Sequence, residues 1–105
     1  MNLKLGRVGG LSKARLIRDL GVELGLRFCI EDSWGGDVTS AAVAHLAAST
    51  TPSQLLMASF MNDWTLEHIA GHQPRSDHGR GRAPNGAGLG ITVDDAALTL
   101  LKTVE

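Results

Sequence analysis

This sequence has few cysteine and aromatic residues and a small net charge. Cys29 is the single cysteine, there is no tyrosine, and aromatic residues make up 4% of the chain. One cysteine cannot form an internal disulfide, so we expect a buried, inert thiol and a cytoplasmic location, where thiols stay reduced. The formal net charge of −1 gives no electrostatic reason to expect nucleic acid or an anionic membrane as a partner.

Long apolar runs are also missing. No stretch approaches the roughly 20 apolar residues that span a bilayer, and the N-terminus lacks the cationic and apolar segments of a signal peptide. We therefore predict neither membrane insertion nor secretion. What is present, 105 residues of which 43% are hydrophobic and 20% charged, is typical of one soluble globular unit at most.

Apolar segments with the spacing of strands and helices alternate along the first 60 residues. Ser12 and Asp37 suit the N-cap positions of two helices, and Gly25 and Pro52 suit their ends. Alternation with short connections is the pattern of a parallel α/β layer, and a barrel and a doubly wound sheet fit it equally well. The expected elements are a strand ending at Lys4, a helix over 12–24, a strand over 27–30, a helix over 38–49 and a strand over 55–58.

The faces of these helices are predicted from their periodicity. In the helix over 12–24, a stripe of Leu16, Ile17, Leu20 and Leu24 is expected to lie on the sheet, with Arg18 largely outside it. His45 lies on the inward stripe of the helix over 38–49, where a hydrogen-bonded structural histidine is the expected role.

The regular pattern fades after Phe60. A short helix over 63–70 and a final helix from Asp94 through Leu101 are predicted, and residues 71–90 indicate an irregular loop. The glycines of Gly86-x-Gly88-x-Gly90 lack the strand and helix of a dinucleotide site and predict a turn. The histidines and arginines of this region, namely His68, His72, His78, Arg75, Arg80 and Arg82, are expected in a solvated loop rather than a metal or RNA site.

Polar side chains follow the carboxyl ends of the three expected strands. Successive side chains of a strand point to opposite faces, so Asn2 and Lys4 share one side, while Phe28, Ile30 and Asp32 point one way on the next strand. In parallel α/β proteins functional residues gather at these ends, where Lys4, Asp32 and either Ser59 or Phe60 lie. A lysine in a confined site can act as a general base, and a snorkelling or salt-bridged lysine is the alternative.

Two ordered motifs carry a resemblance to a known family. They are Asn2-Leu3-Lys4 followed by Arg7-Val8-Gly9-Gly10-Leu11-Ser12-Lys13-Ala14, and Ile30-Glu31-Asp32-Ser33-Trp34-Gly35-Gly36-Asp37; residues 41–49 and 83–91 continue the match. In this order they are similar to the enolase superfamily, in the branch of mandelate racemase and muconate lactonizing enzyme. Within that branch the sequence resembles enzymes that epimerise or dehydrate proline derivatives.

The resemblance implies the C-terminal part of a (β/α) TIM-type barrel: three parallel strands resembling the sixth to eighth, flanking helices and an irregular tail over residues 1–105, without the capping domain. It implies that Lys4 is an acid/base that works on the proton next to the carboxylate of a small-molecule substrate. Asp32 would be a polar substrate contact, and the ring of Phe60 would face a cationic amine. Mg²⁺ would be the cofactor, held by three acidic residues upstream of Met1, so this chain would supply no metal ligand.

Two hypotheses of different classes follow. The first is a segment of a racemase, epimerase or dehydratase that is inactive alone. The second is a noncatalytic remnant or association module, because an open slice of three strands exposes two strand edges and a barrel-lining face. Such a chain should self-associate or bind a complementary fragment.

Overall fold

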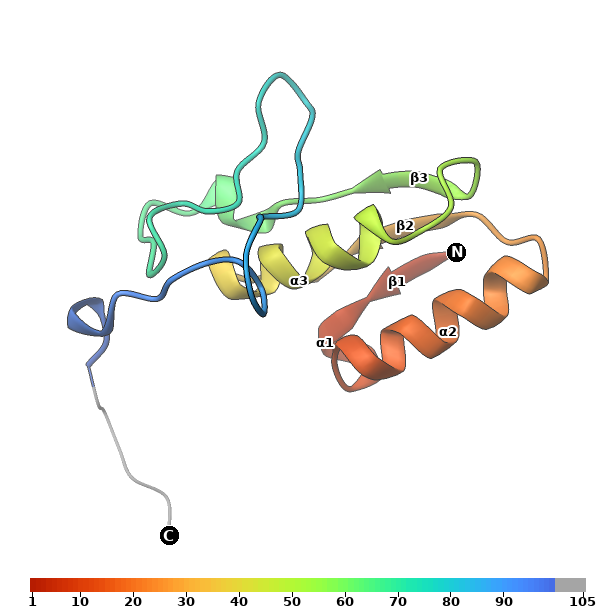
Figure 1. Cartoon of the computed structure of the whole chain (residues 1–105), viewed down its shortest axis with the longest axis horizontal. Helices are drawn as coiled ribbons and strands as arrows, with labels where there is room; N and C mark the ends of the chain where they lie inside the picture. Colours follow the sequence, from red (N-terminus) through yellow and green to blue (C-terminus); the bar gives the residue numbers. More distant parts are fainter. Residues whose placement is uncertain (100–105) are drawn as a thin grey trace, which may run out of the picture.

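The protein has a three-stranded parallel sheet covered by helices, and the computed structural model describes residues 1–99 (Figure 1). The strands are β1 (Asn2–Lys4), β2 (Phe28–Glu31) and β3 (Leu55–Ala58), in the order β1-β2-β3. Both pairings are parallel, with an irregularity of register between Phe28 and Cys29. The predicted α/β class and the parallel order of the strands are confirmed.

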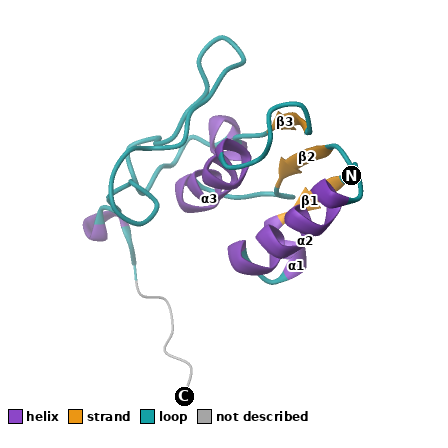
Figure 2. Ribbon diagram, turned by 45° about the vertical axis from the view of Figure 1, so that its right-hand side comes forward, coloured by secondary structure: helices purple, strands orange, loops and turns teal. Residues whose placement is uncertain are grey.

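Three α-helices connect and cover the strands. The short α1 (Leu5–Val8) follows β1 directly, α2 (Leu11–Glu23) leads to β2, and α3 (Asp37–Ala48) joins β2 to β3. Helix α2 contacts β1 and α3, while α3 contacts β2 and β3. Figure 2 shows this layered unit, with the long loop that follows β3 projecting beyond it. None of the helices within residues 1–99 is long and apolar enough to cross a membrane.

The core lies between the sheet and the helices, where the alternation of the strands places it. Leu3 and Leu5 follow one face of the first strand, and Phe28 and Ile30 follow the same face of β2. Together with Ala14, Val43, Leu46 and Ala47 of the two long helices, these side chains form one buried cluster. The opposite face of the sheet therefore carries the polar alternates of β1 and β2.

The inward face of α2 differs from the predicted leucine stripe. Leu16, Leu20 and Leu24 are 63%, 63% and 67% exposed, whereas Ala14, Arg18 and Gly21 are buried. The prediction holds for Ile17, which is partly buried against the core, and is wrong for the three leucines, because it scored apolar residues alone. Arg18 instead donates hydrogen bonds from Nη1 to the Leu46 carbonyl oxygen, Ser49 Oγ and Thr50 Oγ1 at the end of α3. A cation is favourable at that end of a helix, so Arg18 joins the two helices.

The observed N-caps of α2 and α3 differ from the two predicted ones. Gly10, not Ser12, is the N-cap of α2, and Ser12 lies in its first turn. Asp37 is the first residue of α3 and makes no cap hydrogen bond within its own helix. Its carboxylate instead binds residues of the segment after β3, as described below.

Residues after β3 form little regular structure. The predicted α-helix over 63–70 is absent, and a 3₁₀ helix, η1 (Met61–Trp64), overlaps only its first two positions. Residues 71–90 are irregular apart from one bridge between Asp77 and Arg80, as predicted. A second 3₁₀ helix, η2 (Asp95–Ala97), begins after Asp94, whose side chain accepts a hydrogen bond from the Ala96 N–H. The rest of the helix expected through Leu101 lies outside the described residues.

We expect Gly21→Ala to destabilise the protein. A methyl group at Gly21 would collide with the ring of Phe28, which is fully buried against α2. Alanine gains about 1 kcal/mol of helix propensity over glycine, but overpacking a core costs about 1–3 kcal/mol. Urea denaturation should show a lower free energy of unfolding. The exposed control Glu23→Ala should not lower it, and a stabilised Gly21→Ala protein would contradict this packing.

Candidate functional site

Lys4 and Glu31 end two neighbouring strands and face the same side of the sheet. The parallel register of β1 and β2 sets the two residues opposite each other. Their side chains form an ion pair, with Lys4 Nζ 2.8 Å from Glu31 Oε1. Since Leu3 and Leu5 point to the helices, this pair lies on the face away from them.

The ion pair is partly shielded from solvent. The side chain of Lys4 is 32% exposed and that of Glu31 is 19% exposed. Hydrogen bonds from the side chains of Lys4 and Asn2 hold the pKa of Glu31 below its ordinary value, although burial acts against them. Glu31 is therefore a carboxylate at neutral pH, and Lys4 lies beside this negative charge.

Asp32, predicted as a substrate contact, lies directly after β2, next to Glu31. Its Oδ2 accepts a hydrogen bond of 2.7 Å from the Gly6 N–H, and its Oδ1 accepts one of 2.7 Å from the Ser33 N–H. The residue is 9% exposed. Asp32 thus ties the end of β2 to α1, the turn that follows Lys4, and its contact with substrate stays a prediction.

Phe60 lies two residues beyond β3 and is half-buried. It lines a cleft of about 410 Å³, whose other walls include Ser59, Trp64, Arg82 and the alanines on one side of α3. A methyl group at Gly81 would collide with the ring, so this glycine permits the position of Phe60. Lys4 is not among the lining residues. The structure brings Lys4 and Glu31 together, and it places Phe60 in a separate cleft.

A second polar cluster fixes the segment after β3 to the start of α3. Asp37, 1% exposed, accepts hydrogen bonds from Asn62 Nδ2 at 2.9 Å and from the Ala70 N–H at 2.8 Å. His68 Nδ1 lies 3.0 Å from Asp37 Oδ1, and His72 Nε2 lies 2.7 Å from Asp63 Oδ1. The two imidazole rings stack with their centroids 4.0 Å apart.

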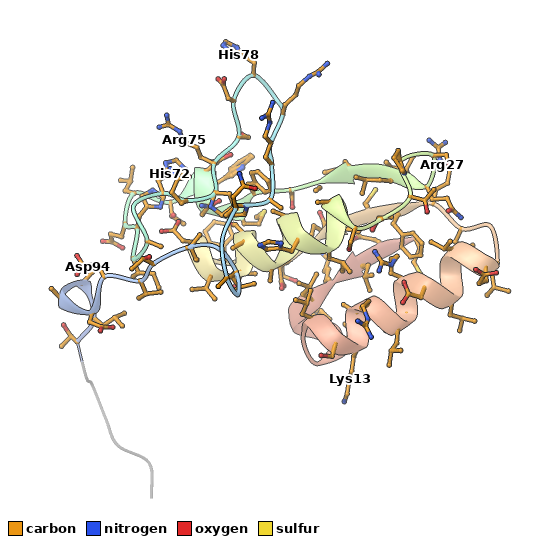
Figure 3. The ribbon with its side chains drawn as sticks, in the orientation of Figure 1. Lys13, Arg27, His72, Arg75, His78 and Asp94 are labelled. Atoms are coloured by element: carbon orange, nitrogen blue, oxygen red, sulfur yellow. The ribbon has the colours of Figure 1, made fainter. Side chains whose placement is uncertain are left out.

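This cluster corrects part of the expected solvated loop. His68 and His72 belong to an ordered set of contacts, while the side chain of His78 is 95% exposed. Figure 3 shows His78 at the tip of the projecting loop, with Arg75 also turned outward. The ordered part of this region is therefore its base, next to α3.

The pKa values of the two carboxyl groups in this cluster, Asp37 and Asp63, lie below their ordinary value. Burial raises the pKa of Asp37, but hydrogen bonds from Asn62, the Ala70 N–H and His68 outweigh it, so the pKa lies below its ordinary value. For Asp63, hydrogen bonds from Ser76 and His72 likewise outweigh burial and lower the pKa. Both groups stay ionised where the loop is anchored.

Other predicted features have simple places in the fold. His45 Nε2 lies 3.0 Å from the Leu89 carbonyl oxygen, which confirms its structural role. Leu89 belongs to the turn predicted over Gly86–Gly90, whose three glycines all have positive φ. Trp34, in the turn after β2, is 65% exposed.

The acidic residues described here do not fit a magnesium site by themselves. Within residues 1–99 no group of three or more histidine, cysteine, aspartate or glutamate side chains is placed to hold a metal ion. Glu31 is paired with Lys4, and both oxygens of Asp32 accept backbone hydrogen bonds. Magnesium prefers several oxygen ligands in octahedral geometry, which these two residues alone do not supply.

Three consecutive parallel strands with helices on one face, and polar residues at their carboxyl ends, define a segment of a parallel α/β barrel. Residues 1–97 match the family described as enolase C-terminal domain-like. The chain belongs to this family.

Two curated relatives are similar over most of the chain. It is 45% identical over 92 residues to the cis-3-hydroxy-L-proline dehydratase of Roseibium aggregatum. This match covers 88% of this chain and 25% of that protein. It is 34% identical over 100 residues to the o-succinylbenzoate synthase of Geobacillus kaustophilus, covering 90% of this chain and 25% of that protein. The chain thus spans about a quarter of the length of these relatives.

Solved structures are also similar to this chain over most of its length. A mandelate racemase/muconate lactonizing enzyme from Roseovarius nubinhibens superposes with a TM-score of 0.87 at 38% identity, over 94% of this chain and 27% of that one. A second protein from this organism, putatively of the same type and complexed with magnesium, gives a TM-score of 0.89 at 30% identity, over 99% of this chain and 29% of that one. The resemblance predicted from the two motifs is confirmed.

We expect the anchor of the loop to weaken only in strong acid. A carboxyl group whose pKa is lowered by folding stabilises the fold above its unfolded pKa, about 3.9 for aspartate, and this stabilisation is lost as pH falls through the folded pKa. The amide resonance of Ala70, which donates to Asp37, should therefore report a titration with a midpoint below about 3.9. In Asp37→Asn this transition should vanish, and a wild-type midpoint above that value would contradict the arrangement.

Proposed function

We propose that this chain supplies one acid/base lysine of an enolase-superfamily enzyme that moves the proton next to a substrate carboxylate, as a racemase, epimerase or dehydratase. The observation that carries the proposal is the position of Lys4. It ends a strand on the face away from the helices, beside an ionised glutamate. The match of residues 1–97 to the family supports it, as does the relative that dehydrates cis-3-hydroxy-L-proline.

The chemistry asked of the chain is a proton transfer. A lysine amine takes a proton from carbon, or an ammonium returns one, when it lies within hydrogen-bond reach of the reacting atom. The open face beside Lys4 is where a small carboxylate would have to lie to be reached by Nζ. Phe60, through its ring, and Asp32, through its remaining lone pairs, are proposed as contacts to the substrate.

Magnesium is proposed as the cofactor of the whole protein, with ligands from outside this chain. When bound, a divalent cation stabilises negative charge that develops on a substrate oxygen. Lys4 would then need only to hold or release its proton. Because the chain spans about a quarter of its relatives, we predict no turnover by the chain alone. A cytoplasmic location, expected from the single cysteine, also stays a prediction.

A chimaera tests the proposal. The chain would replace the matching quarter of the Roseibium aggregatum dehydratase, with cis-3-hydroxy-L-proline and Mg²⁺ supplied. We expect dehydration and exchange of the substrate α-proton with deuterium oxide, because Lys4 completes the acid/base set. Lys4→Met should lower the rate by about 10²-fold or more, the usual contribution of a general acid or base.

Lys13 provides the matched control. It is exposed at the start of α2 and points away from the fold (Figure 3), so Lys13→Met should keep the rate of the chimaera. A folded chimaera whose rate is the same in Lys4→Met would contradict the proposal. Mg²⁺-dependent exchange by the purified chain alone would overturn the prediction that it is inactive.

A second function, association, is favoured by the leucine stripe. Leu16, Leu20 and Leu24 form an exposed apolar row along α2, and Leu56 and Met57 of β3 are 49% and 47% exposed. Exposed apolar rows and unpaired strand edges favour association with other chains. We propose that the free chain associates with a second copy or with a complementary barrel fragment.

Sedimentation velocity tests the association of the chain. We expect oligomers at micromolar concentration, and a shift toward monomer in the double variant Leu16→Ser/Leu20→Ser, because the apolar row is broken. The matched control Arg15→Ser/Glu23→Ser changes two exposed polar positions of the same helix and leaves the net charge unchanged. A monomeric wild-type chain would contradict the proposal.

A further inference from the structure

The cleft beside Phe60 has the lining of a small-molecule site. It has a volume of about 410 Å³ and lies between α3, the end of β3 and the loop that projects from the layered unit in Figure 1. Its apolar part consists of alanines of α3, Leu55 and Ala58 of β3, and the rings of Phe60 and Trp64. Clefts that bind small molecules are mostly apolar, enclose about 300–1,000 Å³ and carry a few polar groups that orient the ligand. The polar groups of this cleft therefore indicate which class of molecule fits it.

Ser59 contributes an unpaired hydroxyl to the cleft. Its Oγ is buried and has no hydrogen-bond partner among residues 1–99, although its N–H donates to the Ile30 carbonyl oxygen at 3.2 Å. A buried polar atom without a partner costs free energy, and nearly all such atoms in proteins are paired. A ligand atom that accepts a hydrogen bond from Ser59 removes this cost.

Arg82 contributes the charge that is available to a ligand. The residue is exposed, and within residues 1–99 no carboxylate forms an ion pair with it. Asp63 also lines the cleft, but its Oδ2 accepts a hydrogen bond from the Ser76 N–H and its Oδ1 lies 2.7 Å from His72 Nε2. The planar guanidinium of arginine binds a carboxylate through two parallel N–H groups. The cleft thus offers a cation to an anionic ligand, while its own carboxylate already has partners.

We propose that this cleft binds a small carboxylate that carries an apolar ring. The ring packs on the alanines of α3 beside Trp64, the carboxylate binds Arg82, and a polar atom of the ligand accepts a hydrogen bond from Ser59. Trp64 is 78% exposed, so its indole has a large ring surface to offer to a ligand. The proposal goes beyond the proposed function, because Lys4 does not line the cleft, no proton is transferred there, and the substrate contact proposed for Phe60 is not used.

The fluorescence of Trp64 tests the proposal on the 105-residue chain. The sequence has two tryptophans, so Trp34→Phe leaves Trp64 as the reporter, and Trp64→Phe leaves Trp34, which does not line the cleft. We expect phenylacetate to change the Trp64 signal with a saturating curve in the millimolar range, as is usual for a ligand of this size. Benzylamine, with the same ring and the opposite charge, and acetate, without the ring, should give no saturation at these concentrations. Trp34 should not respond to any of the three.

Two further variants locate the probe within the cleft. Arg82→Gln should raise the Kd of phenylacetate about tenfold, because a hydrogen bond to a charged group contributes at least this much. The matched control Arg80→Gln removes the same charge from the same loop, outside the lining, and should keep the Kd. Ser59→Ala should raise the Kd about threefold without lowering the free energy of unfolding, since it removes a hydroxyl that is unpaired in the free protein.

An absence of saturable phenylacetate binding would overturn the proposal, and a cleft covered by a second copy of the chain would give this result. Equal binding of benzylamine, or an equal Kd in Arg82→Gln and Arg80→Gln, would also overturn it. If a cleft variant does not fold, the three probes on the Trp34→Phe chain decide, because they differ only in ring and charge. Trp34 is exposed and its replacement leaves the core unchanged.

Discussion

The register between β1 and β2 is the constraint on which the site depends. Parallel pairing sets Lys4 opposite Glu31, and the alternation of the strands turns both side chains away from the core. The buried alternates, Leu3 and Ile30, hold that register, because a slip of one residue would move the apolar set to the open face. Core packing and the position of Lys4 are thus two consequences of one pairing.

A second constraint acts at the start of α3. The buried carboxylate of Asp37 binds Asn62, the Ala70 N–H and His68, and thereby fixes a segment that has little regular structure of its own. Irregular backbone needs such partners, since buried polar groups without hydrogen bonds are costly. The chain after β3 therefore returns to the carboxyl ends of the strands, where the functional residues of parallel α/β proteins gather.

Much of the fold could be predicted from the sequence, because periodicity and turn residues are local signals. The three strands, the two long helices and the irregular 71–90 region were predicted in this way. The inward face of α2 was not, because it depends on Arg18 finding acceptors at the end of another helix. The role of Asp37 was missed for the same reason, since its partners lie 25 to 33 residues further along the chain.

In the candidate site, the adjacent residues Glu31 and Asp32 show the same limit of prediction from sequence. Alternation groups Asp32 with Phe28 and Ile30, and the family resemblance predicts it as a substrate contact. The structure adds Glu31 as the residue that pairs with Lys4. A strand pattern gives the face of a side chain, but the partner requires the register between strands, and a single sequence does not specify it.

The central proposal is that this chain carries the acid/base lysine of a larger magnesium enzyme. Sequencing the genomic DNA immediately upstream of Met1 tests that claim most directly. The account predicts an open frame, in phase with Met1, that encodes a partner lysine on a second barrel strand and three acidic metal ligands on the third, fourth and fifth. A stop codon or an unrelated sequence would contradict it and would favour the association module.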